Sequence, residues 1–287
     1  MITSVKEILE NAKEGGYAVG AFNTVNMEVT QAIVEAAEEL RAPVIIQASE
    51  KTLEYAGGRN IFHMIKNIAE FYAPEIPIGI HLDHGHSFEI VQRVISNGFT
   101  SVMYDGSRKK FEDNLEVTKK VVEFCRDKGV DVQAELGNVP YLSEQKMGEV
   151  NWDKYMTDPE QAKYFVEETG IDALAVAIGN AHDFFKERAV PDWERLSKIR
   201  ELIDIPIIIH GASDWGEDKA PEAVKRGASC FNVDTNTRLA FVNTLSTIFR
   251  GDEDPGFDVR DILGKARQAV QESVKEKIRL FGGEGQV

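Results

Sequence analysis

Short runs of β-branched residues alternate with longer helical segments along almost the whole chain. Eight such runs cover residues 17–23, 43–49, 77–85, 101–107, 131–137, 173–182, 206–213 and 230–235. The intervals between them carry the apolar periodicity of helices, as in residues 27–42 and 111–129, and this alternation is typical of parallel βα units. Eight strands that are each followed by a helix predict a closed (β/α)8 barrel, the TIM-barrel architecture, rather than an open sheet.

Three segments depart from this repeat. Residues 1–16 form a charged amphipathic segment that predicts an extra N-terminal helix, and residues 257–282 predict one or two more helices. Residues 138–157 form an interval too long for a simple connection, which favours an active-site flap. No interdomain linker is evident, so we expect one barrel domain over residues 1–287, with residues 257–287 as a C-terminal helical extension.

The composition excludes several classes of partner. A net charge of −15 disfavours binding to DNA, RNA or anionic membranes, because their phosphates would be repelled rather than neutralised. The two cysteines, Cys125 and Cys230, are too few for a disulfide framework, and no apolar run approaches the roughly 20 residues of a membrane span. The first residues also lack an apolar signal region. We therefore expect a cytoplasmic protein with no nucleic-acid or membrane partner.

Three histidines, His84, His182 and His210, each lie where an apolar run gives way to a Gly-containing turn. In a parallel barrel the carboxyl ends of all strands face one mouth, so these imidazoles are expected to converge there. A catalytic zinc ion takes three such ligands and keeps one position open. We therefore predict a metal site, with Glu135 as an alternative ligand or as a partner that orients one, and with Asp105 as a further strand-end carboxylate of this site.

Asp83 directly precedes the first of these histidines. A carboxylate beside a metal-bound oxygen can transfer a proton to or from it, while the metal polarises a carbonyl group. This combination suits the making and breaking of carbon–carbon bonds, and it also suits metal-assisted hydrolysis.

Candidate phosphate-binding residues follow the seventh and eighth runs, where many barrels bind phosphate through backbone N–H groups and a helix N-terminus. Together with the polar residues that end the first two runs, the candidate substrate-binding set is Asn23, Ser49, Gly211, Ser213, Asn232, Asp234 and Thr235. Ser49 has an alternative interpretation as a helix cap, because serine is favoured at that position.

At these residues the chain resembles the class II, metal-dependent ketose-bisphosphate aldolases, which include fructose- and tagatose-1,6-bisphosphate aldolases. The resemblance extends from about Val5 to Gly282, and the motifs that carry it include HLDHG (81–85), AELG (134–137), IHGAS (209–213) and NVDTNTRLAF (232–241). It implies a zinc ion, or cobalt or another divalent ion, held by His84, His182 and His210 with Glu135 nearby.

The resemblance also implies a reaction. Asp83 would transfer the proton of the C4 hydroxyl while a ketose bisphosphate, by default fructose 1,6-bisphosphate, is cleaved to dihydroxyacetone phosphate and glyceraldehyde 3-phosphate through a zinc-stabilised enediolate. Gly211, Ser213, Asn232, Asp234 and Thr235 match positions that hold the dihydroxyacetone phosphate end of this sugar phosphate substrate. Arg260 matches an arginine that reaches the other phosphate across a subunit interface, which implies a homodimer or homotetramer.

Three positions depart from the family pattern. Residues 138–145 read NVPYLSEQ in place of a glycine pair followed by acidic residues, which leaves Glu144 as the nearest proton-abstracting glutamate. Residues 211–214 read GASD in place of GGSG, and Asp183 replaces a glycine where relatives can bind a monovalent cation. These departures leave two alternatives open: an aldolase for a different or nonphosphorylated ketose, and a non-catalytic paralogue that binds sugar phosphate.

Overall fold

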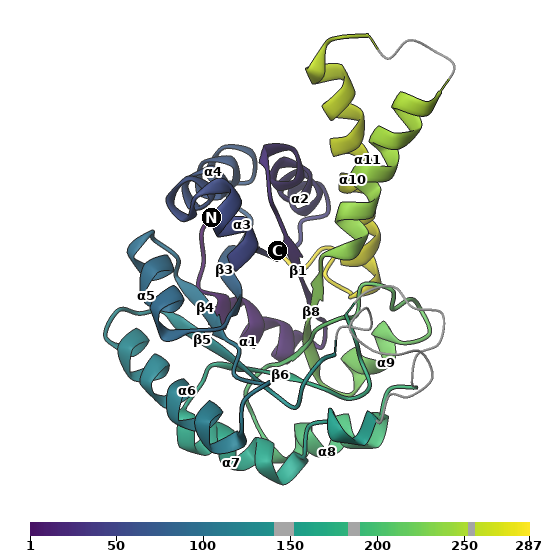
Figure 1. Cartoon of the computed structure of the whole chain (residues 1–287). Helices are drawn as coiled ribbons and strands as arrows, with labels where there is room; N and C mark the ends of the chain where they lie inside the picture. Colours follow the sequence, from purple (N-terminus) through teal and green to yellow (C-terminus); the bar gives the residue numbers. More distant parts are fainter. Residues whose placement is uncertain (141–151, 183–189, 252–255) are drawn as a thin grey trace.

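Eight parallel strands close into a barrel in which spatial neighbours follow the order of the chain, as Figure 1 shows. The computed structural model describes residues 1–140, 152–182, 190–251 and 256–287. The strands are β1 (Val19–Asn23), β2 (Val44–Ser49), β3 (Ile78–Gly85), β4 (Ser101–Tyr104), β5 (Asp131–Leu136), β6 (Ala173–Val176), β7 (Ile207–Ile209) and β8 (Ala228–Val233). The parallel pairing of β8 with β1 closes the ring, so the predicted (β/α)8 barrel is confirmed.

Helices surround this barrel and bury their apolar faces against it. They are α2 (Met27–Glu39), α3 (Glu50–Ala56), α4 (Gly58–Tyr72), α5 (Phe88–Ser96), α6 (Phe111–Arg126), α7 (Pro159–Thr169), α8 (Trp193–Leu202), α9 (Ala220–Lys225) and α10 (Thr235–Arg250), with a short 3-10 helix η2 (Trp152–Lys154) before α7. In α4 the buried residues Ile61, Ile65, Ile68 and Ala69 recur every three or four positions, which places them on the face toward the core.

An extra N-terminal helix, α1 (Val5–Gly15), closes the barrel at the amino ends of the strands. The preceding residues Thr3 and Ser4 bond to Ile78 and Asp131, which begin β3 and β5. The buried face of α1 packs with apolar side chains of the barrel strands, including Val19 of β1. The carboxyl ends of the strands lie at the opposite end of the barrel, which α1 leaves uncovered.

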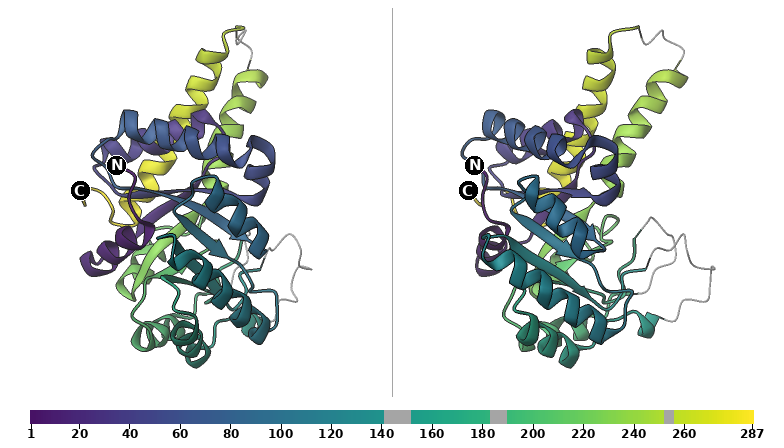
Figure 2. Two further views of the ribbon diagram at one scale, coloured as in Figure 1. Left: turned by 90° about the vertical axis from the view of Figure 1, so that its left-hand side faces the viewer. Right: turned by 60° about the vertical axis from the view of Figure 1, so that its left-hand side comes forward.

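The predicted C-terminal extension is one helix, α11 (Val259–Leu280), in the part of the chain that the structure describes. Figures 1 and 2 show α10 and α11 side by side, extending beyond the barrel as an arm. At the barrel, α11 packs on α2, where Lys275 Nζ lies 2.8 Å from a carboxylate oxygen of Glu39. No described helix has both the length and the apolar composition required to cross a membrane.

The sixth and seventh strands are shorter than the sequence predicts. Residues 177–182 leave the sheet after β6, because Asn180 Oδ1 accepts a hydrogen bond from Ile178 N at 2.7 Å and Gly179 has a φ of 99°. β7 ends at Ile209, and Gly211 has a φ of 61°. His182 and His210 therefore lie on loops rather than on strands.

Candidate metal centre and active site

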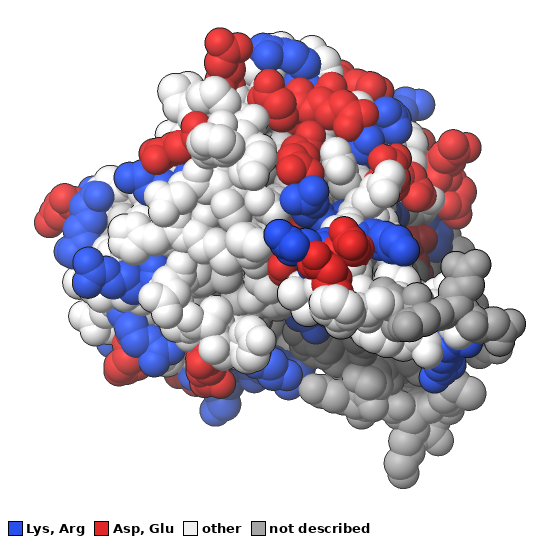
Figure 3. Space-filling model, turned by 90° about the horizontal axis from the view of Figure 1, so that it is seen from above, with Lys and Arg blue, Asp and Glu red and all other residues white. Residues whose placement is uncertain are grey.

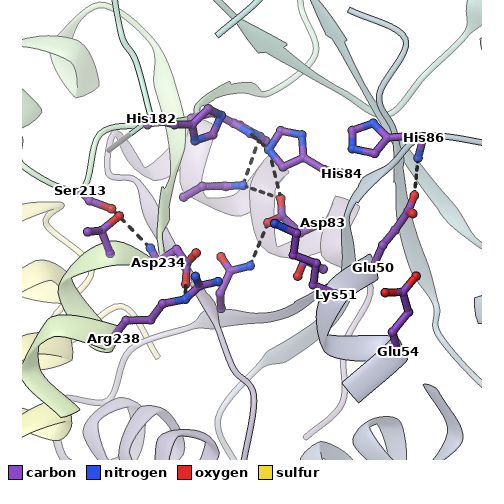
Figure 4. A pocket seen from close by; sticks show the side chains of 16 residues that line it. Glu50, Lys51, Glu54, Asp83, His84, His86, His182, Ser213, Asp234 and Arg238 are labelled. Atoms are coloured by element: carbon purple, nitrogen blue, oxygen red, sulfur yellow. Dashed lines mark hydrogen bonds and ion pairs between the residues drawn. The ribbon is translucent and has the colours of Figure 1, made fainter. Parts of the chain in front are cut away.

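A cavity of about 430 Å³ opens at the carboxyl ends of the strands. Figure 4 shows side chains from several strand ends directed toward it. Its lining includes most of the sequence-predicted residues, namely Asn23, Ser49, Asp83, His84, His182, His210, Gly211, Ser213, Asn232, Asp234 and Thr235. The barrel thus brings together polar groups from both halves of the chain, as the rule for parallel barrels predicts.

His84, the last residue but one of β3, has an unusual conformation, with a φ of 50°. The pairing of β3 with β4 shifts register between Leu82 and Gly85, and this irregularity turns the imidazole toward Asp105. His84 Nδ1 lies 2.7 Å from Asp105 Oδ2, which leaves Nε2 directed at His210. Burial disfavours the charged imidazolium, but Asp83 and Asp105 outweigh it and raise the pKa of His84 to about 10.

His210 is fully buried. Its Nδ1 lies 3.0 Å from His84 Nε2, and its Nε2 lies 3.1 Å from Asn232 Nδ2. Burial and the nearby imidazoles lower the pKa of His210 well below its usual range. This ring therefore stays neutral, whereas His84 would have to release its proton to bind a metal ion.

His182 completes a cluster of three imidazoles, with its ring centroid 5.3 Å from that of His84 and 6.2 Å from that of His210. Gly211 permits this approach, because a Cβ atom there would lie 2.4 Å from the carbonyl of Ala181 and 2.8 Å from His182 N. One nitrogen from each of the three rings lies within 4.8 Å of the others. The predicted convergence of these side chains is present.

Glu135 lies beside this cluster and is almost completely buried. Its Oε1 accepts a hydrogen bond from Val139 N at 3.1 Å, whereas Oε2 has no hydrogen-bond partner among the described residues and lies 3.8 Å from His210 Nδ1. Burial, together with the charge of Asp105, raises the pKa of Glu135 to about 8. A buried carboxylate oxygen without a donor, next to imidazole nitrogens, is what a bound cation would satisfy. The residues present therefore fit a divalent metal ion.

Asp83 is held rigidly beside the metal-ligating candidates. Its Oδ2 accepts from Asn23 Nδ2 at 2.8 Å and its Oδ1 accepts from Asn232 Nδ2 at 3.2 Å. Gln47 Nε2 in turn donates to Asn23 Oδ1 at 2.7 Å. Because both carboxylate oxygens are bonded, the side chain has one orientation at the cavity wall, 3.8 Å from His84 Nε2.

The opposite wall of the cavity is formed where β7 ends and α10 begins (Figure 4). Ser213 Oγ accepts from Asp234 N at 3.3 Å, and Asp234 Oδ1 lies 2.7 Å from Arg238 Nε. Burial raises the pKa of Asp234 to about 6 despite this ion pair. Asp214 is absent from the described residues that line the cavity.

Several sequence candidates lie elsewhere. Arg260 is exposed at the outer part of α11, where its guanidinium pairs with Asp258 at 2.6 Å, and it is not among the described residues of the chain that line this cavity. Glu144 and Asp183 lie outside the described residues. Ser49 both caps α3, accepting from Thr52 N at 3.5 Å, and lines the cavity, so its two interpretations are compatible.

Other lining residues escaped the sequence analysis as site candidates: Glu50, Lys51, Glu54, His86 and Arg238. The first three lie in the short helix α3 that directly follows Ser49. Only their position could have identified these residues, because side chains in the first turn of a helix that follows a strand can still reach the mouth of a barrel. Arg238 lies four residues after Asp234, and this spacing places two helical side chains side by side.

Comparisons with known proteins agree with this geometry. A model of the family described as "Fructose-bisphosphate aldolase class-II" matches residues 3–286. A fructose-bisphosphate aldolase from Thermus caldophilus is 42% identical over 99% of both chains. A fructose-bisphosphate aldolase from Helicobacter pylori is 38% identical over 100% of both chains.

A solved structure is similar as well. The crystal structure of the YdjI aldolase from Escherichia coli K12 aligns with a TM-score of 0.85 and 31% sequence identity, over 99% of both chains. The likeness in sequence and in structure therefore extends over the whole barrel and the arm.

Proposed function

The chain belongs to the class II fructose-bisphosphate aldolase family, and we propose that its substrate is fructose 1,6-bisphosphate, which it cleaves reversibly to dihydroxyacetone phosphate and glyceraldehyde 3-phosphate. One observation carries this proposal: the three-imidazole cluster stands beside the fixed carboxylate of Asp83 in a single cavity. The names of the related enzymes from Thermus caldophilus and Helicobacter pylori support the choice of substrate.

The proposed metal ligands are His84, His182 and His210, with Glu135 and Asp105 around them. Zinc is the proposed ion, because imidazole nitrogens with an adjacent carboxylate suit it; cobalt or a related divalent ion suits the same ligands. A divalent ion bound there supplies positive charge that polarises the substrate carbonyl. Asp105 orients His84 through the 2.7 Å contact to Nδ1 and so keeps Nε2 directed at the cluster.

Asp83 is the proposed proton-transfer group. In cleavage its carboxylate accepts the proton of the C4 hydroxyl, the C3–C4 bond breaks, and the electron pair of that bond remains with the dihydroxyacetone phosphate half. Condensation reverses these steps, and Asp83 returns the proton to the new hydroxyl. A proton is also exchanged at C3, for which Glu144 remains the candidate from the sequence.

The two substrate ends are proposed to lie at different places. Gly211, Ser213, Asn232, Asp234 and Thr235 would bind the dihydroxyacetone phosphate end, while Asn23 and Ser49 border the reacting carbons. Arg260 would reach the second phosphate from another subunit, so the active form is proposed to be a homodimer or homotetramer.

The charge of the chain supports the location and the absence of certain partners that we propose for this enzyme. On the face seen in Figure 3, lysine and arginine side chains are scattered among acidic ones and form no continuous basic area. With a net charge of −15, we propose a cytoplasmic enzyme that binds neither nucleic acid nor membranes. Residues 1–287 are proposed to act as one barrel domain, with residues 257–287 as its C-terminal extension.

A different ketose is the second candidate, suggested by the GASD sequence at residues 211–214. An aspartate beside a bound phosphate dianion would repel it. The described residues that line the cavity include Ser213 but not Asp214, so a phosphorylated donor is favoured.

The substrate is tested by a coupled assay that compares fructose 1,6-bisphosphate with tagatose 1,6-bisphosphate, followed by condensation of glyceraldehyde 3-phosphate with dihydroxyacetone phosphate or with dihydroxyacetone. We expect the highest cleavage kcat/KM with fructose 1,6-bisphosphate, and condensation only with the phosphorylated donor. Equal or faster condensation with dihydroxyacetone would favour the nonphosphorylated ketose instead.

A further inference from the structure

Lysine and arginine each occur once among the described residues that line the cavity, as Lys51 and Arg238. Arg238 Nε lies 2.7 Å from Asp234 Oδ1, so its charge is already paired within the chain. Lys51 is exposed in α3, and no hydrogen bond or ion pair joins its side chain to another described residue. The ammonium group of Lys51 is therefore free to bind an anionic ligand.

The fold directs Lys51 inward. Ser49 ends β2 and α3 begins at the next residue, so Lys51 lies in the first turn of this helix. Figure 4 shows its side chain directed from α3 into the cavity, whereas Glu50 and Glu54 lie on the side of His86. Glu50 Oε1 accepts a hydrogen bond from His86 N at 2.7 Å, which holds this carboxylate on that side.

The substrate proposed above would extend toward this lysine. Its donor end is assigned to the wall at Ser213 and Asp234, and its C4 hydroxyl is assigned to Asp83. Figure 4 shows Asp83 between that wall and α3, and Asp83 is paired in register with Ser49, the residue that precedes α3. The carbons beyond C4, which form the aldehyde half, therefore extend toward Lys51.

The aldehyde half ends in a phosphate, which needs positive charge at a cavity mouth that also contains Glu50 and Glu54. We propose that Lys51 is a specificity-determining residue whose ammonium group binds this terminal phosphate from within the same chain. A lysine binds phosphate as a point charge, so the remaining oxygens can still accept from Arg260 of a second copy. Lys51 thus favours glyceraldehyde 3-phosphate over glyceraldehyde. This inference rests on the proposed aldolase function.

The test measures condensation of dihydroxyacetone phosphate with either aldehyde. Lys51→Met keeps an apolar stem but removes the charge, so the ratio of kcat/KM for glyceraldehyde 3-phosphate to that for glyceraldehyde should fall about 10- to 100-fold. The KM for dihydroxyacetone phosphate, measured in the same preparation, should stay at the wild-type value and shows that the site has folded. Lys51→Arg keeps the charge and should keep most of the preference.

Lys66→Met is the matched control, because it removes one lysine charge from the surface of α4. Lys66 lies 3.8 Å from Glu70 and is not among the described residues that line the cavity, so its aldehyde preference should equal that of the wild type. An unchanged preference in Lys51→Met, an equal loss in Lys66→Met, or a raised KM for dihydroxyacetone phosphate in Lys51→Met would overturn the inference. Failure of the wild type to cleave fructose 1,6-bisphosphate would instead contradict the proposed function.

Discussion

At the scale of single residues, burial determines the chemistry available to the site. Asp83 keeps both carboxylate oxygens hydrogen-bonded to asparagine amides, so its position is fixed before substrate arrives. Glu135, by contrast, keeps one buried oxygen without a donor in the part of the chain that the structure describes. The first arrangement suits a group that moves a proton at a defined place, and the second suits a group that interacts with a cation.

Replacement of Asp83 should separate proton transfer from metal binding. Asp83→Ala removes the proposed base but none of the three imidazoles, so kcat for cleavage should fall about 10²- to 10⁴-fold while the zinc content stays at the wild-type value. Steady-state kinetics and metal analysis of the same preparation measure both quantities. Unaltered kcat would show that another group carries the proton.

Glu135 should make the stability of the metal-free chain depend on pH. Its pKa rises from 4.5 to about 8 on folding, so between these values the folded chain holds a proton that the unfolded chain has released. The free energy of unfolding should therefore fall as pH rises through this window, by a few kcal/mol relative to Glu135→Gln.

Denaturant unfolding of both proteins in chelator, from about pH 5 to about pH 9, measures this difference. Parallel pH dependences for wild type and variant would contradict the raised pKa. Zinc should reverse the trend for the wild type, because a bound cation favours the carboxylate over the carboxylic acid.

At the scale of elements, close contact between the loops after β6 and β7 assembles the cluster. Asn180 Nδ2 donates to His210 O at 2.9 Å, which joins the two loops. The sequence correctly indicated that His182 and His210 meet at the barrel mouth, because any βα barrel brings strand ends together. It overestimated the length of both strands. The hydrogen bonds of Asn180 that replace sheet pairing after β6 form only once the backbone has turned, so the sequence alone does not reveal them.

Gly211 is expected to be essential for this contact. Gly211→Ala would place a Cβ atom 2.4 Å from the carbonyl of Ala181 and should separate the two loops, lowering both zinc affinity and thermal stability. Gly129→Ala is the control, because Gly129 has a nearly identical φ of 62° and a Cβ atom there would meet no atom of the described residues within 4 Å. It should cost only about 1–2 kcal/mol of backbone strain and leave zinc affinity intact. Equal zinc affinities for the two variants would refute this role.

At the scale of the whole molecule, the barrel rule accounts for what the sequence could predict. Strand-end carboxylates and imidazoles were identifiable because their position in the repeat defines where they point. Lys51 and Arg238 were not identifiable in this way, because their reach into the cavity depends on how α3 and α10 leave the strands.

The arm is where the molecule is expected to meet a second copy. Val242, Phe249 and Phe257 on and beside α10 and α11 are 58%, 62% and 98% exposed, which is typical of an interaction surface. If Arg260 acts across that interface, Arg260→Ala and Asp83→Ala should each impair cleavage, whereas a mixture refolded together should recover about a quarter of wild-type activity through hybrid dimers. No recovery in a mixture shown by mass to contain hybrids would contradict a role in trans.

The central claim, a metal-dependent aldolase site built from His84, His182 and His210, is tested most directly by metal removal and restoration. The enzyme would be dialysed against a chelator, its zinc content measured, and cleavage of fructose 1,6-bisphosphate assayed before and after zinc is added back. We predict that activity falls in proportion to the zinc lost and returns on addition of zinc. Full activity in the metal-free enzyme would contradict the account.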